Sequence, residues 1–409
     1  MIALDPAALG RRAEAMLEEL AAISADPDRL VRLYLTPEHR RAGDLVAQWM
    51  REAGLDVSED ALGTLRGRMG QGPRLLLGSH IETVIDAGKY DGPLGVVAAI
   101  LAVDTLLRAG AKPPAIELLA FGDEEGSRFP STLSTSAAVA GAFDRKQLEL
   151  KDAAGVTYAE ALRAYGKNAE EIARAEIPRG EAAAYVEVHI EQGPVLESKS
   201  QPLGVVTAIV GQTRLALILT GEAGHAGTVP MNLRRDALAG EAEIALVAEK
   251  IAREGAGLVA TVGMLEPYPG AMNIIPGRVR MSLDLRAAAD EARRAAIRQF
   301  LEQARAIAKR RHLEIEIELI HELATTPCDT GLQDRLAAAI EATGRKPVRL
   351  ASGAAHDGVM MAKLCPVAML FVRCKGGVSH NPAEYASLED MGLAIAALVR
   401  FIEKFEARP

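Results

Sequence analysis

Potential metal ligands stand at the ends of apolar, strand-like segments that lie far apart in this chain. The five side chains are His80, Asp91, Glu125, His189 and His380. Imidazole and carboxylate groups together suit zinc or a similar divalent ion. Five ligands are too many for one closed site, but they fit two ions that share a bridging carboxylate. A fold that brings His80 and His380 together must build one domain from both ends of the chain.

Glu124 is a further carboxylate, directly beside the proposed ligand Glu125. Adjacent residues that leave a strand point in different directions. One of the two can therefore bind metal while the other faces a water molecule that needs a base. Glu82, two residues after His80, is placed to fix the imidazole of that ligand. The combination indicates a hydrolase.

Each of these residues also has a purely structural interpretation. Asp91 precedes an apolar helix and could be its N-cap. Paired acids such as residues 124–125 are often solvated, and a single histidine such as His189 is usually a core residue. His380 lies in a loop, where chemistry is common. The conjunction of five such residues at strand ends favours a metal site.

Of the other histidines, His356 is either a partner of the ligands or structural, and three are interpreted as structural: His39, His312 and His321.

Short apolar strands alternate with helices from about residue 74, which is typical of an α/β fold around a mainly parallel sheet. The proposed ligands follow the carboxyl ends of the strands, where open α/β sheets usually place their sites. The expected strands are residues 74–78, 115–121, 184–190 and 367–374, and the expected helices are residues 6–23, 95–108 and 331–343, with a further helix starting at 36–38.

A self-contained segment, residues 211–324, interrupts this pattern. Its expected elements follow the order β-α-β-β-α-β of the ferredoxin-like sandwich. Residues 1–210 and 325–409 are therefore expected to form one discontinuous catalytic domain with an insertion hinged at both ends. The expected elements of the insertion are strand 214–220, helix 233–253, strands 257–265 and 278–285, helix 289–311 and strand 313–320.

The inserted segment carries polar residues of its own. His225 lies in a turn of small residues and could donate to an oxyanion. Arg286 offers a planar fork that pairs with a carboxylate, although it could equally be a surface arginine. Gln212 and Asn273 offer amides.

Composition argues against several other classes of protein. The net charge is −8 and the chain has one Trp, so nucleic acid and anionic membranes are not expected partners. The most apolar stretch, residues 92–107, is too short to span a bilayer. No signal peptide is visible. Three cysteines without metal-type spacing indicate reduced thiols in a cytoplasmic protein: Cys328, Cys365 and Cys374.

Several longer strings resemble the M20-type binuclear metallohydrolases, and within them the hydantoinase/carbamoylase branch. The resemblance extends from about residue 36 to residue 385. Its strings are Gly78-Ser79-His80, Gly88-Lys89-Tyr90-Asp91-Gly92, Asp123-Glu124-Glu125-Gly126-Ser127-Arg128-Phe129, His189-Ile190-Glu191-Gln192-Gly193-Pro194, Gly224-His225-Ala226-Gly227-Thr228-Val229-Pro230-Met231, Asn273-Ile274-Ile275-Pro276-Gly277 and Ser379-His380-Asn381-Pro382-Ala383-Glu384.

This resemblance implies a zinc-exopeptidase-like catalytic domain with a mixed, mainly parallel sheet, and an inserted lid that joins a homodimer. It implies that Glu124 is the general base and that His225 reaches into the partner subunit's site. It further implies that Gln212, Asn273 and Arg286 hold a substrate carboxylate. Two divalent ions, zinc or manganese in the first place and cobalt or nickel as alternatives, are expected on His80, Asp91 (bridging), Glu125, His189 and His380.

Within the branch, strings at residues 86–92, 208–215, 224–231 and 369–374 look most like the allantoate amidohydrolases. We therefore expect hydrolysis of a ureido (carbamoyl) C–N bond on a small carboxylated substrate, with allantoate first, releasing ammonia and carbon dioxide. An N-carbamoyl-L-amino acid hydrolase would share this chemistry. An N-acyl-amino acid hydrolase or aminopeptidase is more distant. A non-catalytic ligand-binding protein with the same fold is a further alternative.

Three positions depart from the family pattern. Glu82 stands where Asp is usual, and its extra methylene could rotate His80 or shift the acid. Thr135 stands where Gly is usual. Ala355 also replaces a Gly, which matters if that position needs a positive φ. These departures bear on turnover and substrate identity more than on the fold.

Overall fold

The computed structural model describes residues 2–406, and the chain divides into two compact units. Unit 1 comprises Met1–Thr207 and Cys328–Pro409, and unit 2 comprises Ala208–Pro327. The boundaries expected from the sequence are 211 and 324. Unit 1 is therefore made from both ends of the chain, and unit 2 is one continuous segment.

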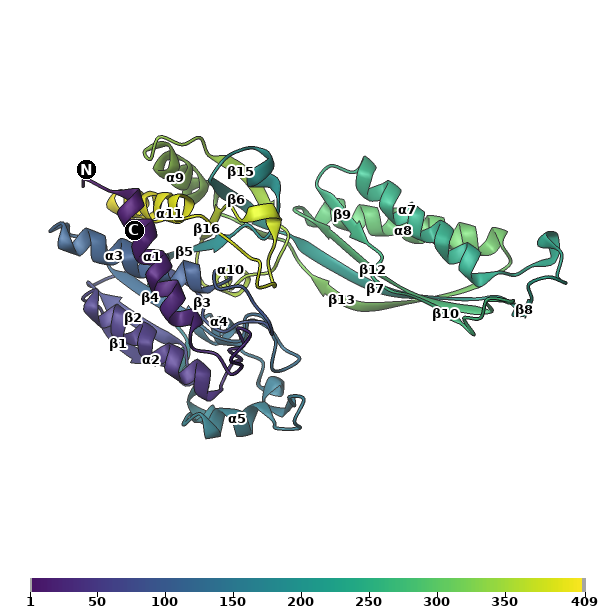
Figure 1. Ribbon diagram of the computed structural model, residues 1–409, viewed down its shortest axis with the longest axis horizontal. Coiled ribbons are helices and arrows are strands. Elements are labelled where there is room, and N and C mark those ends of the chain that lie inside the picture. Colours follow the sequence, from purple (N-terminus) through teal and green to yellow (C-terminus); the bar gives the residue numbers. More distant parts are fainter. Residues whose placement is uncertain (1, 407–409) are drawn as a thin grey trace. The chain divides into compact units, whose positions relative to one another are not determined.

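A mixed sheet forms the centre of unit 1. Its strands are β1 (Asp56–Glu59), β2 (Leu65–Met69), β3 (Arg74–His80), β4 (Ile116–Phe121), β5 (Ala182–Ile190), β6 (Leu203–Ile209), β15 (Val348–Ser352) and β16 (Val367–Val372). They lie in the order β1-β2-β4-β3-β5-β16-β6, with β15 also paired to β6 (Figure 1). The four central strands β4, β3, β5 and β16 are parallel, and antiparallel pairs flank them. The expected α/β fold with a mixed, mainly parallel sheet is confirmed.

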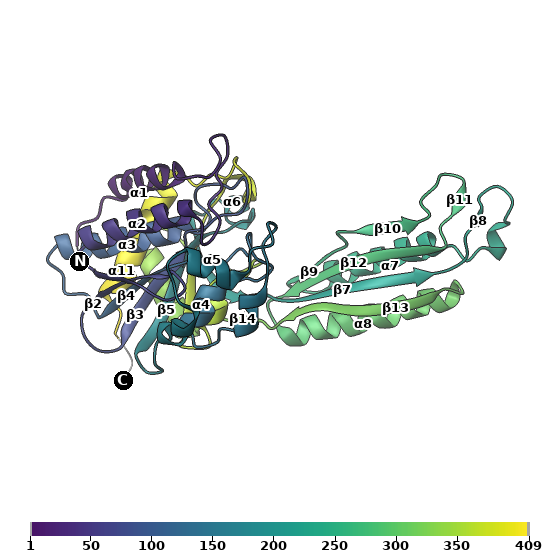
Figure 2. The same cartoon turned by 90° about the horizontal axis from the view of Figure 1, so that it is seen from below.

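Helices cover both faces of this sheet (Figure 2). They are α1 (Pro6–Ala21), α2 (Pro37–Glu52), α3 (Pro93–Arg108), α4 (Ser134–Val139), α5 (Tyr158–Ala164), α6 (Val195–Ser198), α9 (Thr330–Glu341), α10 (Gly358–Met361) and α11 (Leu388–Glu403). Helices α1, α3 and α11 pack into one large apolar core with the sheet, and α4 and α10 pack on the other face. Four short 3-10 turns complete the described helical elements: η1 (Arg145–Glu149), η2 (Ala169–Ala175), η3 (Met231–Leu233, in unit 2) and η4 (Lys375–Gly377).

Strand β3 shows why the central strands read as unbroken apolar runs. Leu75 and Leu77 enter the core formed with α1, α3 and α11, whereas Leu76 enters the core on the opposite face. Successive side chains of a strand point to opposite faces, and a parallel sheet covered on both sides buries both sets. His80 therefore ends a strand that is buried from Leu75 onward.

Unit 2 is an antiparallel sheet with two helices on one face. Its elements are β7 (Gly211–Thr220), β8 (Gly224–His225), α7 (Ala237–Glu254), β9 (Leu258–Thr261), β10 (Leu265–Tyr268), β11 (Ile274–Ile275), β12 (Arg278–Ala287), α8 (Asp290–Arg310), β13 (Glu314–Leu323) and β14 (Thr326–Pro327). The sheet order is β10-β12-β7-β13, with β9 also on β12. Helices α7 and α8 share one apolar core with β7 and β12.

Two sequence-based boundaries in unit 2 were wrong. The single strand expected at residues 257–265 is two strands, β9 and β10, which pair with different parts of β12. Gly263 lies in the interruption, and glycine weakens strands. Helix α7 begins at Ala237, after the expected start at 233, because the side chain of Asp236 caps it by accepting the backbone N–H of Ala239 at 3.0 Å.

The chain enters and leaves unit 2 through two adjacent segments. Thr326 pairs with Ile209 and Pro327 pairs with Ala208 in an antiparallel arrangement.

Over residues 2–406, none of the helices has the length and apolar character required for a transmembrane span.

Candidate metal centre

The carboxyl ends of the parallel strands meet at one edge of the sheet of unit 1, and the five predicted ligands lie there. His80 ends β3 and His189 lies near the end of β5. Two overlapping groups have donor atoms within 4.8 Å of one another. The first is His80, Asp91 and His189, and the second is Asp91, Glu125 and His380. Asp91 belongs to both groups, as a bridging carboxylate would.

Asp91 lies between two imidazoles. Its Oδ1 is 3.1 Å from Nε2 of His189, and its Oδ2 is 3.1 Å from Nε2 of His380. The N-cap of α3 is Gly92, which makes no side-chain capping bond. The interpretation of Asp91 as a helix cap was therefore wrong.

Gly92 is required by this arrangement for two reasons. Its φ is +81°, which side chains other than glycine rarely adopt. A Cβ at this position would also lie 2.3 Å from Cε1 of His80. The absent side chain lets the start of α3 pass directly against the imidazole of His80.

The histidines on β3 and β5 present the same ring nitrogen to the cluster. Nδ1 of His80 donates to the carbonyl oxygen of Glu82 at 3.1 Å, and Nδ1 of His189 donates to that of Ile190 at 2.9 Å. A carbonyl only accepts, so each Nδ1 carries a proton. Nε2 is then the atom available as a metal ligand in the neutral imidazole.

The electrostatics of the cluster reflect these contacts. Burial alone would raise the pKa of Asp91, but the close imidazoles of His189 and His380 outweigh it and hold that pKa well below its usual range. Burial alone would lower the pKa of His189, but Asp91 raises it to about 9. Contacts with Asp91 and Glu125 raise the pKa of His380 to about 10. The ionised carboxylate of Asp91 thus favours positive charge on the two imidazoles that flank it.

The donor set fits a divalent cation. Oδ1 of Asp91 and Nε2 of His189 are buried and close together, yet neither makes a well-directed hydrogen bond. Buried polar atoms are normally satisfied, and a shared cation would satisfy both of these. Imidazole and carboxylate ligands suit zinc and also manganese, cobalt or nickel.

Glu124 and Glu125 leave β4 in different directions, as expected from their adjacency. Glu125 Oε1 lies 3.2 Å from Nε2 of His380. Glu124 is buried and forms a separate close group with His80 and Glu125. Burial, reinforced by the neighbouring Glu125, raises the pKa of Glu124 well above its usual range. Glu124 therefore faces the cluster as a carboxyl group that holds a proton readily.

The carboxylate of Glu82 does not hydrogen-bond the imidazole of His80, contrary to the expectation from the sequence. Its carboxylate is 3.6 Å from Nδ1 of His80, whereas its backbone carbonyl takes the hydrogen bond. The carboxylate Oε1 instead accepts the backbone N–H of Glu124 and, at 3.3 Å, that of Glu125. The longer side chain therefore reaches the turn that carries both acids.

The other two departures from the family pattern are accommodated locally. Thr135 is buried in α4, and its hydroxyl bonds both the N–H and the carbonyl of Gly122. Ala355 does not have a positive φ. The backbone at residue 355 is therefore one that any residue can adopt.

Sequence reasoning gave no role to three residues that contact the ligands. Nε2 of Gln192 donates to Oδ2 of Asp91 at 2.9 Å and lies 3.2 Å from Oγ of Ser379. The Ser379 hydroxyl is 3.0 Å from the same Asp91 oxygen, and Glu384 accepts from Ser379 at 2.8 Å. All three lie inside the motif strings around His189 and His380, and that proximity was the available signal.

The backbone is strained at three points around the cluster. Asp123, Gln192 and His380 have φ values of 59°, 55° and 53°. Non-glycine residues seldom adopt the left-handed region, and such residues concentrate at functional sites. Each follows a different parallel strand, so the strain is distributed around the same edge of the sheet.

His356 lies beside a ligand, whereas His39 does not. The ring centroid of His356 is 4.4 Å from that of His189, and its Nε2 is 2.8 Å from Oγ of Ser352. His39 is buried with its Nδ1 3.0 Å from the hydroxyl of Tyr165.

Two of the residues predicted to hold the substrate carboxylate lie together in unit 2. Arg286 on β12 stands opposite Gln212 on β7. Arg286 binds the carboxylate of Asp284 through Nε and Nη2, each at 3.0 Å, and Gln212 donates to it at 2.6 Å. Asp284 therefore holds both side chains in fixed positions.

Asn273 and His225 lie in or next to a separate two-stranded sheet, β8 and β11, beyond the other end of β7. Gly224–His225 pairs with Ile274–Ile275 beyond the Thr220 end of β7. The eight steps from Gln212 to Thr220 span about 26 Å at roughly 3.3 Å per residue. Within one chain Asn273 therefore does not lie beside Gln212 and Arg286, and its role at the same carboxylate stays a prediction.

His225 is exposed and its tautomer is set locally. Its Nδ1 accepts the backbone N–H of Gly227 at 3.0 Å. The proton of the neutral ring is then on Nε2. His225 thus presents a donor, as a role at an oxyanion requires.

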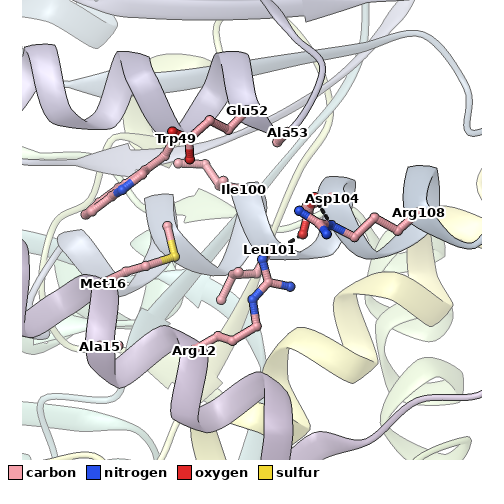
Figure 3. Close-up of a pocket in the computed structure, with 10 residues that line it drawn as sticks. All are labelled: Arg12, Ala15, Met16, Trp49, Glu52, Ala53, Ile100, Leu101, Asp104 and Arg108. Atoms are coloured by element: carbon pink, nitrogen blue, oxygen red, sulfur yellow. Dashed lines mark hydrogen bonds and ion pairs between the residues drawn. The ribbon is translucent and has the colours of Figure 1, made fainter.

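A separate surface cavity of about 270 Å³ lies among α1, α2 and α3 (Figure 3). Met16, Leu101 and other apolar side chains line it. Arg12 and Arg108 both pair with Asp104, at 2.7 Å and 2.6 Å. It contains none of the predicted site residues, and its charged groups already satisfy one another.

Comparison with known proteins gives consistent results. The profile of peptidase family M20/M25/M40 matches residues 76–404. An N-carbamoyl-L-amino acid amidohydrolase of Geobacillus stearothermophilus is 42% identical, over 95% of this chain and 97% of that protein. An allantoate deiminase of Arabidopsis thaliana is 39% identical, over 98% of this chain and 83% of that protein. The crystal structure of a hydantoinase/carbamoylase family amidase from Burkholderia multivorans superimposes with a TM-score of 0.90 at 32% identity. The match covers 96% of this chain and 97% of that chain.

Proposed function

The chain belongs to peptidase family M20/M25/M40, and from this premise we propose that it is a metal-dependent amidohydrolase. The bond cleaved is a ureido (carbamoyl) C–N bond of a small carboxylated substrate, with allantoate as the first candidate. The names of two relatives, an allantoate deiminase and an N-carbamoyl-L-amino acid amidohydrolase, support this class of bond. The family resemblance read from the sequence motifs is confirmed.

One observation carries the proposal: Asp91 lies 3.1 Å from the Nε2 atoms of both His189 and His380. His80 and Glu125 complete the two groups that share this carboxylate. We assign these five residues as ligands of two divalent cations. Such a pair, when bound, polarises a carbonyl group and lowers the pKa of a water molecule.

Glu124 serves as the general base. It is buried beside Glu125 and His80. It takes a proton from the attacking water and returns it to the nitrogen that leaves. The products are an amine that keeps the rest of the substrate and a carbamate, which breaks down into ammonia and carbon dioxide. Glu82 assists by holding the backbone of residues 124 and 125.

Unit 2 supplies the residues that recognise the substrate. Arg286 and Gln212 orient its carboxylate, and Asp284 keeps Arg286 in place. His225 donates from Nε2 to the oxyanion that develops on the carbonyl, with Asn273 beside it. Strand β7 spans about 26 Å from Gln212 to Thr220, and His225 and Asn273 lie beyond its Thr220 end, so both pairs reach one small substrate only if two chains contribute. We therefore propose a homodimer joined through unit 2, in which His225 and Asn273 serve the partner subunit's site.

A substrate comparison tests this proposal. Apo-protein is reconstituted with Zn²⁺ or Mn²⁺, and ammonia release is measured from allantoate and from N-carbamoyl-L-amino acids. Highest kcat/KM on allantoate supports the primary assignment, and highest kcat/KM on an N-carbamoyl-L-amino acid supports the alternative hydrolase. Metal-loaded protein that releases ammonia from neither would overturn the proposal and favour a non-catalytic binding protein.

A further inference from the structure

Glu384 is a buried carboxylate that joins two loops of the candidate metal centre. Its Oε1 accepts the backbone N–H of Tyr90 at 3.0 Å and that of Asp91 at 3.1 Å. Its Oε2 accepts the hydroxyl of Ser379 at 2.8 Å. The residue is only 5% exposed. The bonds from Tyr90 and Asp91 connect the loop that precedes α3 with the loop that follows β16, and the bond from Ser379 braces the second loop.

The two loops carry two of the three residues of the second ligand group, and the third, Glu125, follows β4. Asp91 comes from the first loop and His380 from the second, and Oδ2 of Asp91 is 3.1 Å from Nε2 of His380. His380 is half exposed and its backbone has a φ of 53°. A half-exposed ligand on a strained loop has few contacts of its own to fix it. The bonds through Glu384 and Ser379 supply that restraint.

Glu384 acts on the ligands indirectly. Both of its oxygens are engaged by three protein donors. Among the described residues, it belongs to none of the groups whose ligand atoms lie within 4.8 Å of one another. A carboxylate is suited to this place because one of its oxygens can accept both backbone N–H groups while the other bonds the hydroxyl of Ser379.

Gly88 shows how closely the first loop packs on this carboxylate. A Cβ on residue 88 would lie 2.3 Å from Oε1 and 2.4 Å from Cβ of Glu384. Any side chain at this position must therefore displace Glu384. The Gly88→Ala substitution disturbs the junction while leaving the carboxylate itself in the sequence.

We propose that Glu384 is a positioning residue that sets His380 against Asp91 and thereby determines how tightly the group of Asp91, Glu125 and His380 binds its divalent cation. This inference rests on the metal centre of the proposed function. Removal of a residue that hydrogen-bonds a metal ligand typically lowers metal affinity by about 10–100-fold.

The test is titration of metal-free protein with Zn²⁺ or Mn²⁺ by calorimetry, together with the metal content after dialysis. Glu384→Ala should raise the Kd of one of the two ions by about 10–100-fold and leave the Kd of the other unchanged. Excess metal should restore kcat, with KM unchanged. Glu384→Gln should remain close to wild type, because its amide oxygen accepts the two backbone N–H groups and its NH2 donates to Ser379. Gly88→Ala should weaken the same ion.

Asp329→Ala is the matched control for a general loss of stability. Asp329 caps α9 by accepting the backbone N–H of Leu332 at 2.8 Å, and it lies beside Val367 at the amino end of β16, at the edge opposite the metal centre. This variant should lower Tm and leave both Kd values unchanged. The inference is overturned if Glu384→Ala binds both ions as wild type does, or if Asp329→Ala weakens them equally.

Two further outcomes separate this inference from the function on which it rests. If Glu384→Ala does not fold, the metal affinity of Gly88→Ala is compared with that of Glu384→Gln. Equal metal affinities in these two variants contradict the proposal. Wild-type protein that binds no divalent ion would refute the metal centre itself. Wild-type protein that binds two ions but hydrolyses no ureido substrate would refute the proposed reaction and leave this inference standing.

Discussion

Nε2 of His189 lies 3.1 Å from Oδ1 of Asp91, and both atoms are buried without a well-directed hydrogen bond. His189 lies near the end of β5, whereas Asp91 lies in the loop between β3 and α3 and is not the cap of that helix. Such a pair is costly unless a cation lies against it. The hydrolytic chemistry proposed for the chain depends on this pair and on the acids beside it.

Substitutions at the adjacent residues Glu124 and Glu125 should have different effects, the first on turnover and the second on metal content. Glu124→Gln should keep both metal ions and lower kcat by about 10²–10⁴-fold, because only proton transfer is lost. Glu125→Gln should lower metal content, because Glu125 lies in the ligand group with Asp91 and His380. Steady-state kinetics and elemental analysis of the two proteins check this. Near-normal turnover in metal-loaded Glu124→Gln would remove Glu124 from its role.

Arg286 should govern affinity for the substrate carboxylate. Arg286→Lys should raise KM by about tenfold or more, because an ammonium cannot replace a planar fork. Arg214 also contacts Asp284, at 3.1 Å, but is half exposed, so Arg214→Lys is the control and should leave KM unchanged. Kinetics on a carboxylated substrate and on its amide analogue separate the two effects. An unchanged KM in Arg286→Lys would place Arg286 outside the site.

A mixture of two inactive variants should recover activity if sites are shared between subunits. His225→Ala and Arg286→Ala should each be nearly inactive alone. When they are co-expressed, half of the dimers are mixed and each has one intact site, so about a quarter of wild-type activity should return. Absence of recovery in a preparation shown to contain mixed dimers would mean that each chain supplies its own His225.

Glu241 should make the stability of unit 2 depend on pH. It is fully buried in α7, and neither carboxylate oxygen has a hydrogen-bond partner. Burial raises its pKa from 4.5 to about 8. Between these values the folded protein holds a proton that the unfolded chain has lost. The stabilisation is thus complete below pH 4.5 and is lost as pH rises through 8, by up to about 1.4 kcal/mol per pH unit.

Calorimetric melting of wild type and Glu241→Gln at pH 5 and pH 8.5 measures this effect. The glutamine variant should gain in Tm relative to wild type as pH rises, because it has no proton to lose. Glu249→Gln, an exposed position on the same helix, is the control and should follow wild type. Parallel pH dependence of Tm in wild type and Glu241→Gln would show that Glu241 does not titrate in this window.

The strand ends of unit 1 could be predicted because the central strands are buried on both faces. Runs such as Leu75-Leu76-Leu77 read as apolar without interruption, and the ligands follow them directly. Strand β1, at the edge of the sheet, was not anticipated, because its four residues are partly exposed and carry no comparable apolar signal. In unit 2 the strict alternation of residues 313–320 predicted β13, whereas the cap at Asp236 was overlooked.

The direction of individual side chains in the site could not be read from the sequence. The roles of Glu82 and Glu384 depend on backbone N–H groups of residues distant in the chain, namely Glu124 and Asp91. No spacing rule reports such contacts. The separation of Asn273 from Arg286 likewise follows from sheet register, which a list of motifs does not contain.

Metal content per chain is the most direct test of the account. Wild-type protein purified with Zn²⁺ or Mn²⁺ and dialysed should retain two divalent ions per chain, measured by elemental analysis. Asp91→Ala should retain fewer than one, because both ligand groups lose their common member. Ureido hydrolysis by metal-free wild type in the presence of a chelator, or two ions retained by Asp91→Ala, would contradict it.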